Sequence, residues 1–299
     1  MEHKKFMDIE RIKKGYAENF RSGDFIYIEE KIDGSNAAIR YDAATNSIVA
    51  QSRKQILTPT NNLRGFFEFT QRLDVDKVKK ELGENLIAYG EWAVPHTVRY
   101  PDDKYNNFYM FDVYDLATRS YLPQNKVIAI AAMLGLTVAP IFYIGEFISW
   151  EHCASFVGKS ELGAESGEGI VVKNMTRLND PDNRHPFYLK IVGEKFCETK
   201  AHGHIKQTNP DVLAKLEEDR ALAETIVTEA RVTKILNKFV DEGIIPEDWG
   251  SMDMPVIAKN LPRAVYEDCL KEEPEVVKAI DNFGKIANSI VMGIARSKL

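Results

Sequence analysis

The chain has 299 residues, of which 44% are hydrophobic and 28% are charged, with 12 prolines and 18 glycines. This composition excludes collagen-like, disordered and disulfide-scaffold proteins, and predicts one large folded domain with a smaller one, or two comparable domains. The net charge of −6 argues against a protein that coats nucleic acid everywhere, because affinity for phosphate comes from cations. Any nucleic-acid site is therefore expected to be a local basic surface.

The cysteines and the apolar stretches indicate the cellular compartment in which the protein is expected to act. Cys153, Cys197 and Cys269 are far apart and lack CxxC spacing, so neither a disulfide framework nor a zinc module is expected. The first residues are charged and lack the apolar run of a signal peptide. The uncharged stretch 127–145 is interrupted by a glycine and a proline, which favours core over a membrane span. We expect a cytoplasmic protein with no membrane partner.

Alternating apolar residues and turn signals predict a strand-rich region up to about Phe196. The expected strands are 25–31, 37–41, 47–51, 86–92, 108–114, 137–144, 169–173 and 187–192. The expected helices are 9–19, 65–75 and 125–134. Turn signals at 33–35 and 42–46 are typical of hairpins, which favours antiparallel sheets over a regular βαβ alternation. The predicted class is α+β.

The last third of the chain changes to a helical pattern. Apolar residues recur every three or four positions over 213–239, after a helix-start signal at 209–210. The same spacing predicts a further helix over 276–291. We therefore expect two domains, residues 1–205 and residues 206–299, of which the second is small and all-helical.

The segment EKIDGSN, residues 30–36, places Lys31 at the end of a predicted strand and directly before a turn. A lysine at such a position projects from the edge of the sheet toward any cleft that the sheet forms. Taken alone, it is more often a solvated charge beside a turn. The segment is therefore informative only in combination with motifs further along the chain.

Five further segments with charged residues occur downstream in a fixed order. They are SRK (52–54), YGE (89–91), FYMFD (108–112), EGIVVK (168–173) and YLKIV (188–192). This ordered set resembles the nucleotidyltransferase motifs of the covalent superfamily that contains DNA ligases, RNA ligases and mRNA capping enzymes. The resemblance covers roughly residues 25–198. It implies a nucleotidyltransferase domain of ATP-grasp-like antiparallel sheets with flanking helices.

Within this superfamily the chain is most similar to the RNA ligase 2 family. The segment 190–198 resembles the last motif of that family, and a helical C-terminal domain also fits. About thirty residues precede Lys31, too few for the extra domain of NAD-dependent DNA ligases, so the resemblance implies ATP as adenylate donor with Mg²⁺ or Mn²⁺. Two features depart from the pattern. Val192 replaces a usual second lysine, for which Lys195 is a doubtful substitute, and Asp33 is closer to DNA ligases and capping enzymes.

The implied reaction needs a neutral amine to attack the α-phosphorus of ATP, whereas a free lysine with a pKa of ~10.4 is almost wholly protonated at neutral pH. Nearby cations favour the neutral amine, and Lys173, Lys190, Arg53 and bound magnesium are the expected agents. By resemblance, Lys173 and Lys190 act with Lys31 as catalytic residues that contact the α-phosphate. Arg53 would contact the same AMP or the strand being sealed.

The adenine base needs a flat apolar slot with one polar group. Strand alternation is expected to place Tyr109, Phe111 and Val113 on one face, and the resemblance implies that Phe111 stacks on the base. Val171 would close the other side of the slot. Glu30, directly before Lys31, would accept a hydrogen bond from the adenine amino group.

Three polar side chains complete the expected site. Asn36 would position the phosphate at the nick. Glu91 and Glu168 are suited to hold a hard metal ion or the ribose hydroxyls of the nucleotide. Each residue would be unremarkable alone, as core or as a strand-end charge, and only their joint order favours the functional interpretation.

The sequence thus predicts an ATP-dependent RNA ligase that joins 3′-hydroxyl and 5′-phosphate ends through a lysyl-AMP, at a nick in an RNA duplex, and acts as a monomer. Two alternatives remain open. One is a DNA-joining or GMP-transferring capping relative, and the other is a non-catalytic nucleic-acid-binding relative. The helical domain carries basic residues that could meet a duplex backbone, although acidic residues dilute the patch. They are Lys206, Lys215, Arg231, Lys234 and Lys238.

Overall fold

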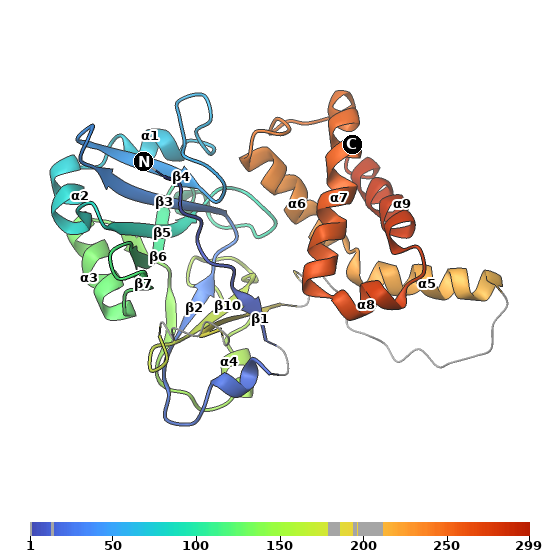
Figure 1. The fold of residues 1–299 in the computed structure, drawn as a ribbon, viewed down its shortest axis with the longest axis horizontal. Helices are drawn as coiled ribbons and strands as arrows, with labels where there is room; N and C mark the ends of the chain where they lie inside the picture. Colours follow the sequence, from blue (N-terminus) through green and yellow to red (C-terminus); the bar gives the residue numbers. More distant parts are fainter. Residues whose placement is uncertain (1, 13–14, 179–185, 194–195, 197–211) are drawn as a thin grey trace. The chain divides into compact units, whose positions relative to one another are not determined.

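The structure is a computed structural model that describes residues 2–12, 15–178, 186–193, 196 and 212–299. The chain divides into two compact units, Met1–Gly193 and Glu194–Leu299. The first unit is built on two β-sheets and the second on helices (Figure 1). The α+β class predicted from the sequence is therefore confirmed. The predicted domain boundary at residue 205 lies outside the described residues.

A five-stranded sheet holds the strand that ends at Lys31. Its order is β1, β11, β10, β2 and β9, and neighbouring strands are antiparallel except β1 and β11. The strands are β1 (Glu10–Arg11), β2 (Phe25–Lys31), β9 (Ile141–Glu146), β10 (Gly169–Asn174) and β11 (Tyr188–Val192). One face, with Ile28 and Ile170, packs in a core with Cys153 of α4 (Trp150–Ala154). The face that carries Lys31 is the opposite one.

A six-stranded sheet forms the other half of this unit. Its order is β4, β3, β5, β6 and β7, with β8 paired to β6. The strands are β3 (Ser35–Asp42), β4 (Ser47–Ser52), β5 (Leu86–Trp92), β6 (Phe108–Asp115), β7 (Ser120–Tyr121) and β8 (Thr137–Val138). One face packs on α1 (Phe66–Thr70), α2 (Val75–Leu82) and α3 (Gln124–Leu134) (Figure 1). The other face packs Tyr89 and Phe111 against Phe6 of the N-terminal segment.

The helix predicted at 9–19 is wrong. Glu10–Arg11 forms β1, and only a short 3-10 turn at Ala17–Asn19 comes after it in the described part of that stretch. The backbone N–H of Ile12 donates to the carbonyl of Lys190 at 3.3 Å, so pairing with β11 takes up a hydrogen bond that a helix would have used. Helical apolar spacing in a short segment could not reveal this long-range partner.

Two further predicted elements are each divided in two. The helix expected at 65–75 becomes α1 and the start of α2, because the Asp74 side chain accepts hydrogen bonds from two N–H groups and so begins a new helix. The strand expected at 137–144 becomes β8 and β9, which flank Pro140. A proline lacks the N–H that a continuous ladder needs.

The turn predicted at Asp33-Gly34-Ser35 is not a hairpin, since β2 and β3 belong to different sheets. A side chain at Gly34 would place its Cβ 2.6 Å from the carbonyl oxygen of Trp92, so glycine is required where the chain crosses. The turn at 42–46 does form the predicted hairpin between β3 and β4. Lys31 therefore lies where the chain passes from one sheet to the other.

The C-terminal unit is helical in its described part, as predicted. Its helices are α5 (Val212–Ile226), α6 (Glu229–Asp241), α7 (Met254–Glu272), α8 (Pro274–Ala279) and α9 (Phe283–Arg296). The single helix predicted at 276–291 is divided between α8 and α9, where Asn282 takes a left-handed φ of 56°. Such a residue interrupts the helical hydrogen-bond ladder.

Arg231 is fully buried in this unit and cannot contact a nucleic-acid backbone as predicted. Its Nε lies 2.9 Å from Oδ2 of Asp268, and its Nη1 donates to the carbonyl of Ile226 at 2.5 Å. The side chains of Lys206 and Lys215 lie outside the described residues. Of the predicted basic patch, the structure describes only Lys234 and Lys238 on accessible positions, and both are half-buried.

Two smaller expectations concern the membrane and the thiols. Within the described ranges, no helix combines the length and apolar character needed to cross a bilayer. Cys153 and Cys269 are buried thiols, and Cys197 lies outside the described residues.

Candidate active site

Lys31 ends β2 with its amine beside a carboxylate. Its Nζ lies 2.5 Å from Oε2 of Glu168, and its side chain is 20% exposed. Glu168 directly precedes Gly169, which pairs with Lys31 across the two strands. A Cβ at Gly169 would lie 2.2 Å from the carbonyl oxygen of Ile191, so a larger residue would push β11 away. The Glu168-Gly169 pair thus fixes a carboxylate next to a partly accessible amine.

The strand register gathers several predicted residues on one face of the five-stranded sheet. Residues directly opposite each other in antiparallel strands point to the same face. Lys31 opposes Gly169, and Val171 opposes both Glu29 and Lys190. Alternation along β10 adds Lys173 to the same face.

Asp33 organises the loop beside Lys31. Its carboxylate accepts hydrogen bonds from the N–H groups of Thr97 and Val98, both at 2.7 Å, and its Oδ1 lies 3.7 Å from Nδ1 of His96. Burial opposes ionisation, but the hydrogen bond and charge of His96 help to hold the pKa of Asp33 below its ordinary value. Sequence reasoning missed His96, a loop histidine outside every motif. A histidine five residues beyond the YGE segment carries no recognisable signal.

Glu91 joins this group from the six-stranded sheet. Burial raises the pKa of the Glu91 carboxyl to about 8, and the negative charges of Glu168 and Asp33 act in the same direction. The positive charges of Lys31 and His96 oppose them. The structure therefore brings Lys31, Glu91 and Glu168 into one electrostatic group, while their chemical roles stay predictions.

Glu91 and Glu168 can be tested for their fit to a divalent metal. Mg²⁺ is usually held by one or two carboxylates together with substrate phosphates and water. No group of three or more His, Cys, Asp or Glu side chains in the described part of the chain is arranged to hold a metal ion. The carboxylate pair fits a partial site of the magnesium kind, and a cation there would relieve the repulsion that helps to raise the pKa of Glu91.

Lys173 is placed differently from its predicted role. Its side chain is 1% exposed, and its Nζ lies 2.8 Å from Oε2 of Glu29 and 3.2 Å from Oδ2 of Asp112. The amine also donates to the carbonyl of Phe111 at 2.6 Å. Burial alone would lower the pKa of Lys173, but Asp112 and Glu29 outweigh it and raise that pKa, so the amine stays charged. Lys173 thus ties the two sheets together, and its contact with the α-phosphate stays a prediction.

The surroundings of Lys31 also differ from the prediction of neighbouring cations. Lys173 is neutralised by buried carboxylates, and the guanidinium of Arg53 forms an ion pair with Asp8. Glu168 pairs with Lys31 at 2.5 Å, and Glu91 and Asp33 interact with Lys31 electrostatically.

Glu30 points to the opposite face of the sheet from Lys31. It opposes Ile170 in the register, and its side chain is buried. Its Oε1 accepts a hydrogen bond from Oγ of Ser160 at 2.6 Å, and its Oε2 accepts one from the N–H of Glu161 at 2.8 Å. The carboxylate that was expected to read adenine is therefore engaged in anchoring the 160–161 loop.

Phe111 lies at a β-bulge. The register of β5 and β6 shifts between Tyr89, which opposes Asp112, and Gly90, which opposes Met110. A bulge inserts one extra residue and reverses the alternation beyond it. The prediction that Val113 shares a face with Phe111 is therefore wrong, because Val113 packs in the core on the helical side. The bulge directs both Phe111 and Asp112 away from α1–α3.

The remaining predicted residues lie around this group. Asn36 opposes Glu91 in the register of β3 and β5, so the two share a face of the six-stranded sheet. Val171 is buried, and Lys190 is half-buried in β11. Lys195, the doubtful substitute for a second lysine, lies outside the described residues.

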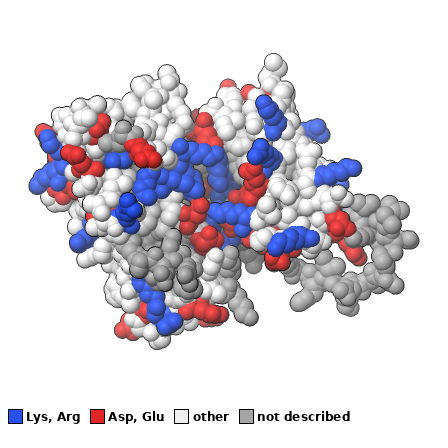
Figure 2. Space-filling view, in the orientation of Figure 1, with Lys and Arg blue, Asp and Glu red and all other residues white. Residues whose placement is uncertain are grey.

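Charge on the visible surface is mixed. In Figure 2, Lys and Arg side chains form a run across the first unit, and Asp and Glu side chains are interspersed among them. The net charge of −6 is thus compatible with a local basic surface.

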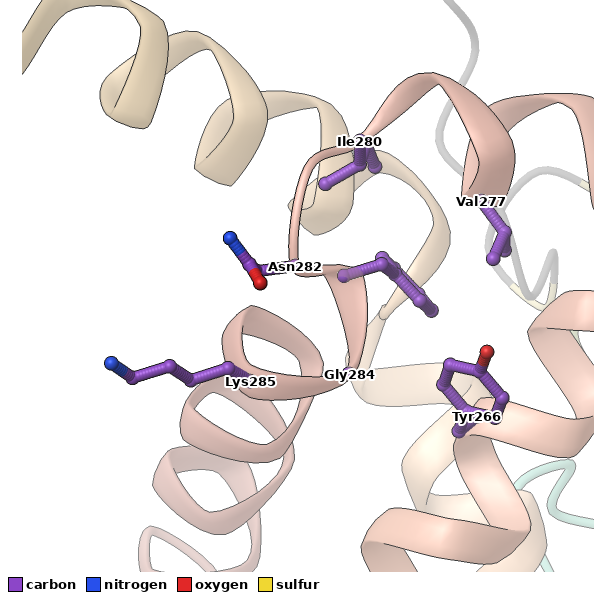
Figure 3. Close-up of a pocket in the computed structure, with 7 residues that line it drawn as sticks. Tyr266, Val277, Ile280, Asn282, Gly284 and Lys285 are labelled. Atoms are coloured by element: carbon purple, nitrogen blue, oxygen red, sulfur yellow. The ribbon is translucent and has the colours of Figure 1, made fainter. Parts of the chain in front are cut away.

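The C-terminal unit contains a pocket of about 410 Å³ at the junction of α7, α8 and α9 (Figure 3). Its lining residues are Tyr266, Val277, Ile280, Asn282, Phe283, Gly284 and Lys285. Lys285 is the one charged residue of this lining, and its amine has no acidic or nucleophilic neighbour in the lining to form a reactive pair. We assign this pocket no chemistry.

Comparison with known proteins points to the same region of the chain. The family model described as RNA ligase matches residues 24–192, which is more than half of the 299 residues. No curated protein matches the chain. The match to the RNA ligase family model spans all the strands of the candidate site from β2 to β11.

Solved structures of a Naegleria gruberi RNA ligase are similar to part of the chain. A single-residue variant with ATP and Mn is 18% identical, with a TM-score of 0.46 over 65% of this chain and 57% of that one. The same ligase with PPi is 19% identical, with a TM-score of 0.44 over 65% and 57%. The matched region thus spans less than two thirds of that ligase. On the strength of the family model, this chain belongs to the RNA ligase family.

Proposed function

We propose that this chain is an ATP-dependent RNA ligase that joins a 3′-hydroxyl end to a 5′-phosphate end. In the first step, Nζ of Lys31 bonds to the α-phosphorus of ATP as the bond to the pyrophosphate oxygen breaks, and pyrophosphate leaves. AMP then passes from Lys31 to the 5′-phosphate of RNA. The 3′-hydroxyl attacks that activated phosphate, and AMP is released as the strand is sealed.

One observation carries this proposal: the Lys31 amine is partly exposed at the crossing between two sheets, 2.5 Å from Glu168. A lysine that served only as a strut would be buried among several acceptors, as Lys173 is. The Oε2 atom of Glu168 is the nearest acceptor for the proton that the ammonium must lose before attack. Lys31 is thus both reachable and next to a base.

The divalent ion, Mg²⁺ or Mn²⁺, would be held by Glu91 and Glu168 together with nucleotide phosphates. When bound, it would neutralise phosphate charge and make the α-phosphorus easier to attack. The chain's own contribution is to hold both carboxylates beside Lys31, where burial raises the pKa of Glu91 to about 8.

The remaining site residues are proposed to bind the nucleotide and the RNA end. Phe111 and Val171 would enclose the base, Lys190 would contact the α-phosphate, and Arg53 would contact the AMP or the strand being sealed. Asn36 would position the phosphate at the nick. The adenine role proposed for Glu30 would require its carboxylate to leave Ser160 and Glu161, or to be replaced by its backbone.

The helical C-terminal part is proposed to bind the RNA ends as a separate domain beginning near residue 206. The helical unit found from Glu194 supports a division in this region. The substrate proposed is a nick in duplex RNA, and the active form proposed is a monomer in the cytoplasm. Binding would be by shape and charge, as is usual for duplex RNA.

The decisive experiment is covalent labelling. Purified protein incubated with α-labelled ATP and Mg²⁺ should retain label through denaturing electrophoresis, and Lys31→Ala should lose it. Lys80→Ala, which removes a lysine on a surface position of α2, is the matched control and should label like the wild type. A wild type that takes no label removes the proposal.

A second experiment identifies the nucleotide and the nucleic acid. Labelling with ATP should exceed labelling with GTP, since preferential GMP uptake would favour a capping relative. Multiple-turnover sealing should be faster on a nicked RNA duplex than on a nicked DNA duplex or on single-stranded RNA ends. Label without any sealing would leave the protein as an adenylyltransferase that does not join strands.

A further inference from the structure

The N-terminal segment, residues 2–11, lies across one face of the six-stranded sheet and ends on the five-stranded sheet. Side chains of the six-stranded sheet form hydrogen bonds with its backbone. The carbonyl of Glu2 accepts from Nη1 of Arg40 at 3.1 Å, and the carbonyl of Lys4 accepts from the hydroxyl of Tyr89 at 2.7 Å. Figure 1 shows this first stretch of chain running over β3 to β5 before it reaches β1. The segment is thus a built part of the unit.

Phe6 is the apolar anchor of this segment. Its side chain is 3% exposed, and its ring centroid lies 4.9 Å from that of Phe111 and 5.1 Å from that of Tyr89. A third ring, Tyr121, lies 5.6 Å away edge-on. Phe111 is itself only half-buried and sits at a bulge, where the backbone constrains a side chain less than in a regular strand. The ring of Phe6 therefore restricts the orientation of the ring proposed to stack on adenine.

Asp8 holds a second proposed site residue. Its carboxylate forms an ion pair with the guanidinium of Arg53, which lies just beyond the end of β4. Asp8 also pairs with Lys5 at 3.1 Å, within the segment itself. An arginine side chain has about four rotatable bonds, so a fixed carboxylate partner limits where its guanidinium can lie.

The end of the segment reaches a third proposed site residue. In β1, Arg11 pairs with Lys190, and Glu10 pairs with Leu189. The same short segment therefore contacts Phe111 and Arg53 of one sheet and the backbone of Lys190 in the other. A segment that only shielded the edge of a sheet would not need these contacts. This segment contacts three proposed nucleotide-binding residues from two sheets.

We infer that residues 2–11 are part of the nucleotide-binding machinery, with Phe6 as the positioning residue for Phe111 and Asp8 as the positioning residue for Arg53. This inference rests on the proposed function. It adds a role for a segment that lies outside the matched region 24–192. Neither Phe6 nor Asp8 has to touch the nucleotide, because each acts through the residue that it holds.

The first test compares two buried phenylalanines. Phe6→Leu keeps apolar volume and removes the ring beside Phe111, and should raise the KM for ATP in lysyl-AMP formation about threefold to tenfold with kcat changed less than twofold. Phe66→Leu is the matched control, since Phe66 is fully buried among Trp92 and Phe108 on the helical side of the same sheet. It should lower the melting temperature without raising KM. An unchanged KM for ATP in Phe6→Leu would overturn the role of Phe6. A lowered KM would overturn it as well, because it would mean that the Phe6 ring blocks the adenine slot.

The second test is a double-mutant cycle on the surface pair. Arg53→Ala identifies which of the three steps depends on Arg53, and Asp8→Asn should slow that same step about twofold to fivefold. In the absence of Arg53, Asp8→Asn should have no further effect, because Asp8 acts only through Arg53. Asp8→Glu should restore most of the rate, and Lys80→Ala, which removes an exposed lysine of α2 outside this segment, should leave it unchanged. Additive effects of the two substitutions would overturn the role of Asp8.

These outcomes are separable from failure of the proposed function. If the wild type takes no label from ATP, the ligase proposal itself fails. If the wild type labels normally while Phe6→Leu and Asp8→Asn both behave like it, only the inference about residues 2–11 fails. Circular dichroism and melting curves of each variant distinguish loss of positioning from loss of fold.

Discussion

Lys31 and Lys173 stand on the same face of one sheet, yet their surroundings are opposite. Lys31 closes β2 with a side chain that is 20% exposed and one carboxylate partner at 2.5 Å. Lys173 lies further into the sheet with a side chain that is 1% exposed, between Glu29 and Asp112. The end of the strand leaves one amine reachable, while the middle of the sheet surrounds the other with oxygens.

The difference in surroundings distinguishes a lysine that can react from a lysine that stabilises the fold. A buried ammonium between two carboxylates is held in place by charge, and removing it leaves buried charges without a partner. A partly exposed ammonium with one neighbouring acceptor can exchange its proton and its partner. The same residue type on the same face thus serves as a strut in one region and as the proposed nucleophile in the other.

The largest expected effect on the free energy of unfolding comes from replacing Lys173, which links the two sheets. Lys173→Met should lower the free energy of unfolding by about 3–5 kcal/mol, because it leaves Glu29 and Asp112 buried without their cation. Lys31→Met should lower it by only about 1.5–3 kcal/mol, the range of one charged hydrogen bond, and should abolish labelling by ATP. Urea unfolding at pH 7 and the labelling assay measure the two effects separately.

Equal stability of Lys173→Met and Lys31→Met would contradict the proposed difference between the two lysines. A Lys173→Met protein that unfolds within about 1 kcal/mol of the wild type, yet takes no label, would return Lys173 to the phosphate-contacting role predicted from the sequence. The comparison is therefore sharpest when stability and labelling are measured on the same preparations.

A smaller effect should appear in the pH dependence at the reactive end. Burial raises the pKa of Glu91 to about 8 from an ordinary 4.5, so the folded protein holds a proton that the unfolded chain releases as pH rises. The stability from that proton is complete below about pH 4.5 and is lost as pH rises toward 8. Glu91→Gln has no proton to lose. It should therefore become more stable than the wild type by about 2 kcal/mol at pH 8.5 without metal, a value discounted for partial exposure.

The control for Glu91 is an exposed carboxyl in the same unit. Glu84→Gln changes the net charge by the same amount and should leave the slope of stability against pH close to that of the wild type. Adding Mg²⁺ at pH 8.5 should raise the melting temperature of the wild type more than that of Glu91→Gln, since a cation replaces the lost proton. Parallel pH curves for wild type and Glu91→Gln would mean that Glu91 is already ionised and not strained by its neighbours.

Sequence reasoning succeeded where local pattern decides the structure. The strands at 25–31 and 86–92 were predicted with their observed bounds, because apolar residues in buried strands and strong turn signals are local. The position of Lys31 at a strand end is a consequence of that pattern. The placement of Glu91 and Glu168 near it came from a resemblance in the order of motifs.

The differences between the expected and the observed surroundings of these residues share a physical cause, because each depends on partners distant in the chain. Glu30 faces away from Lys31 because residues 160–161 supply its hydrogen bonds, and Val113 faces the core because a bulge shifts the register by one residue. The role of Lys173 depends on Asp112, which comes from the other sheet. None of these contacts leaves a periodic trace in the sequence.

The smallest expected effect tests how the strut is completed. The hydroxyl of Tyr188 donates to Oδ1 of Asp112 at 3.1 Å, whereas Lys173 pairs with Oδ2 of the same carboxylate. Tyr188→Phe keeps the ring and removes that donor, and should cost about 1 kcal/mol of unfolding free energy. Labelling by ATP should be nearly unchanged, because Lys173 stays charged between its two carboxylates. If Tyr188→Phe instead lost labelling at full stability, the buried middle of the sheet would take part in chemistry, and the division between strut and nucleophile would have to be abandoned.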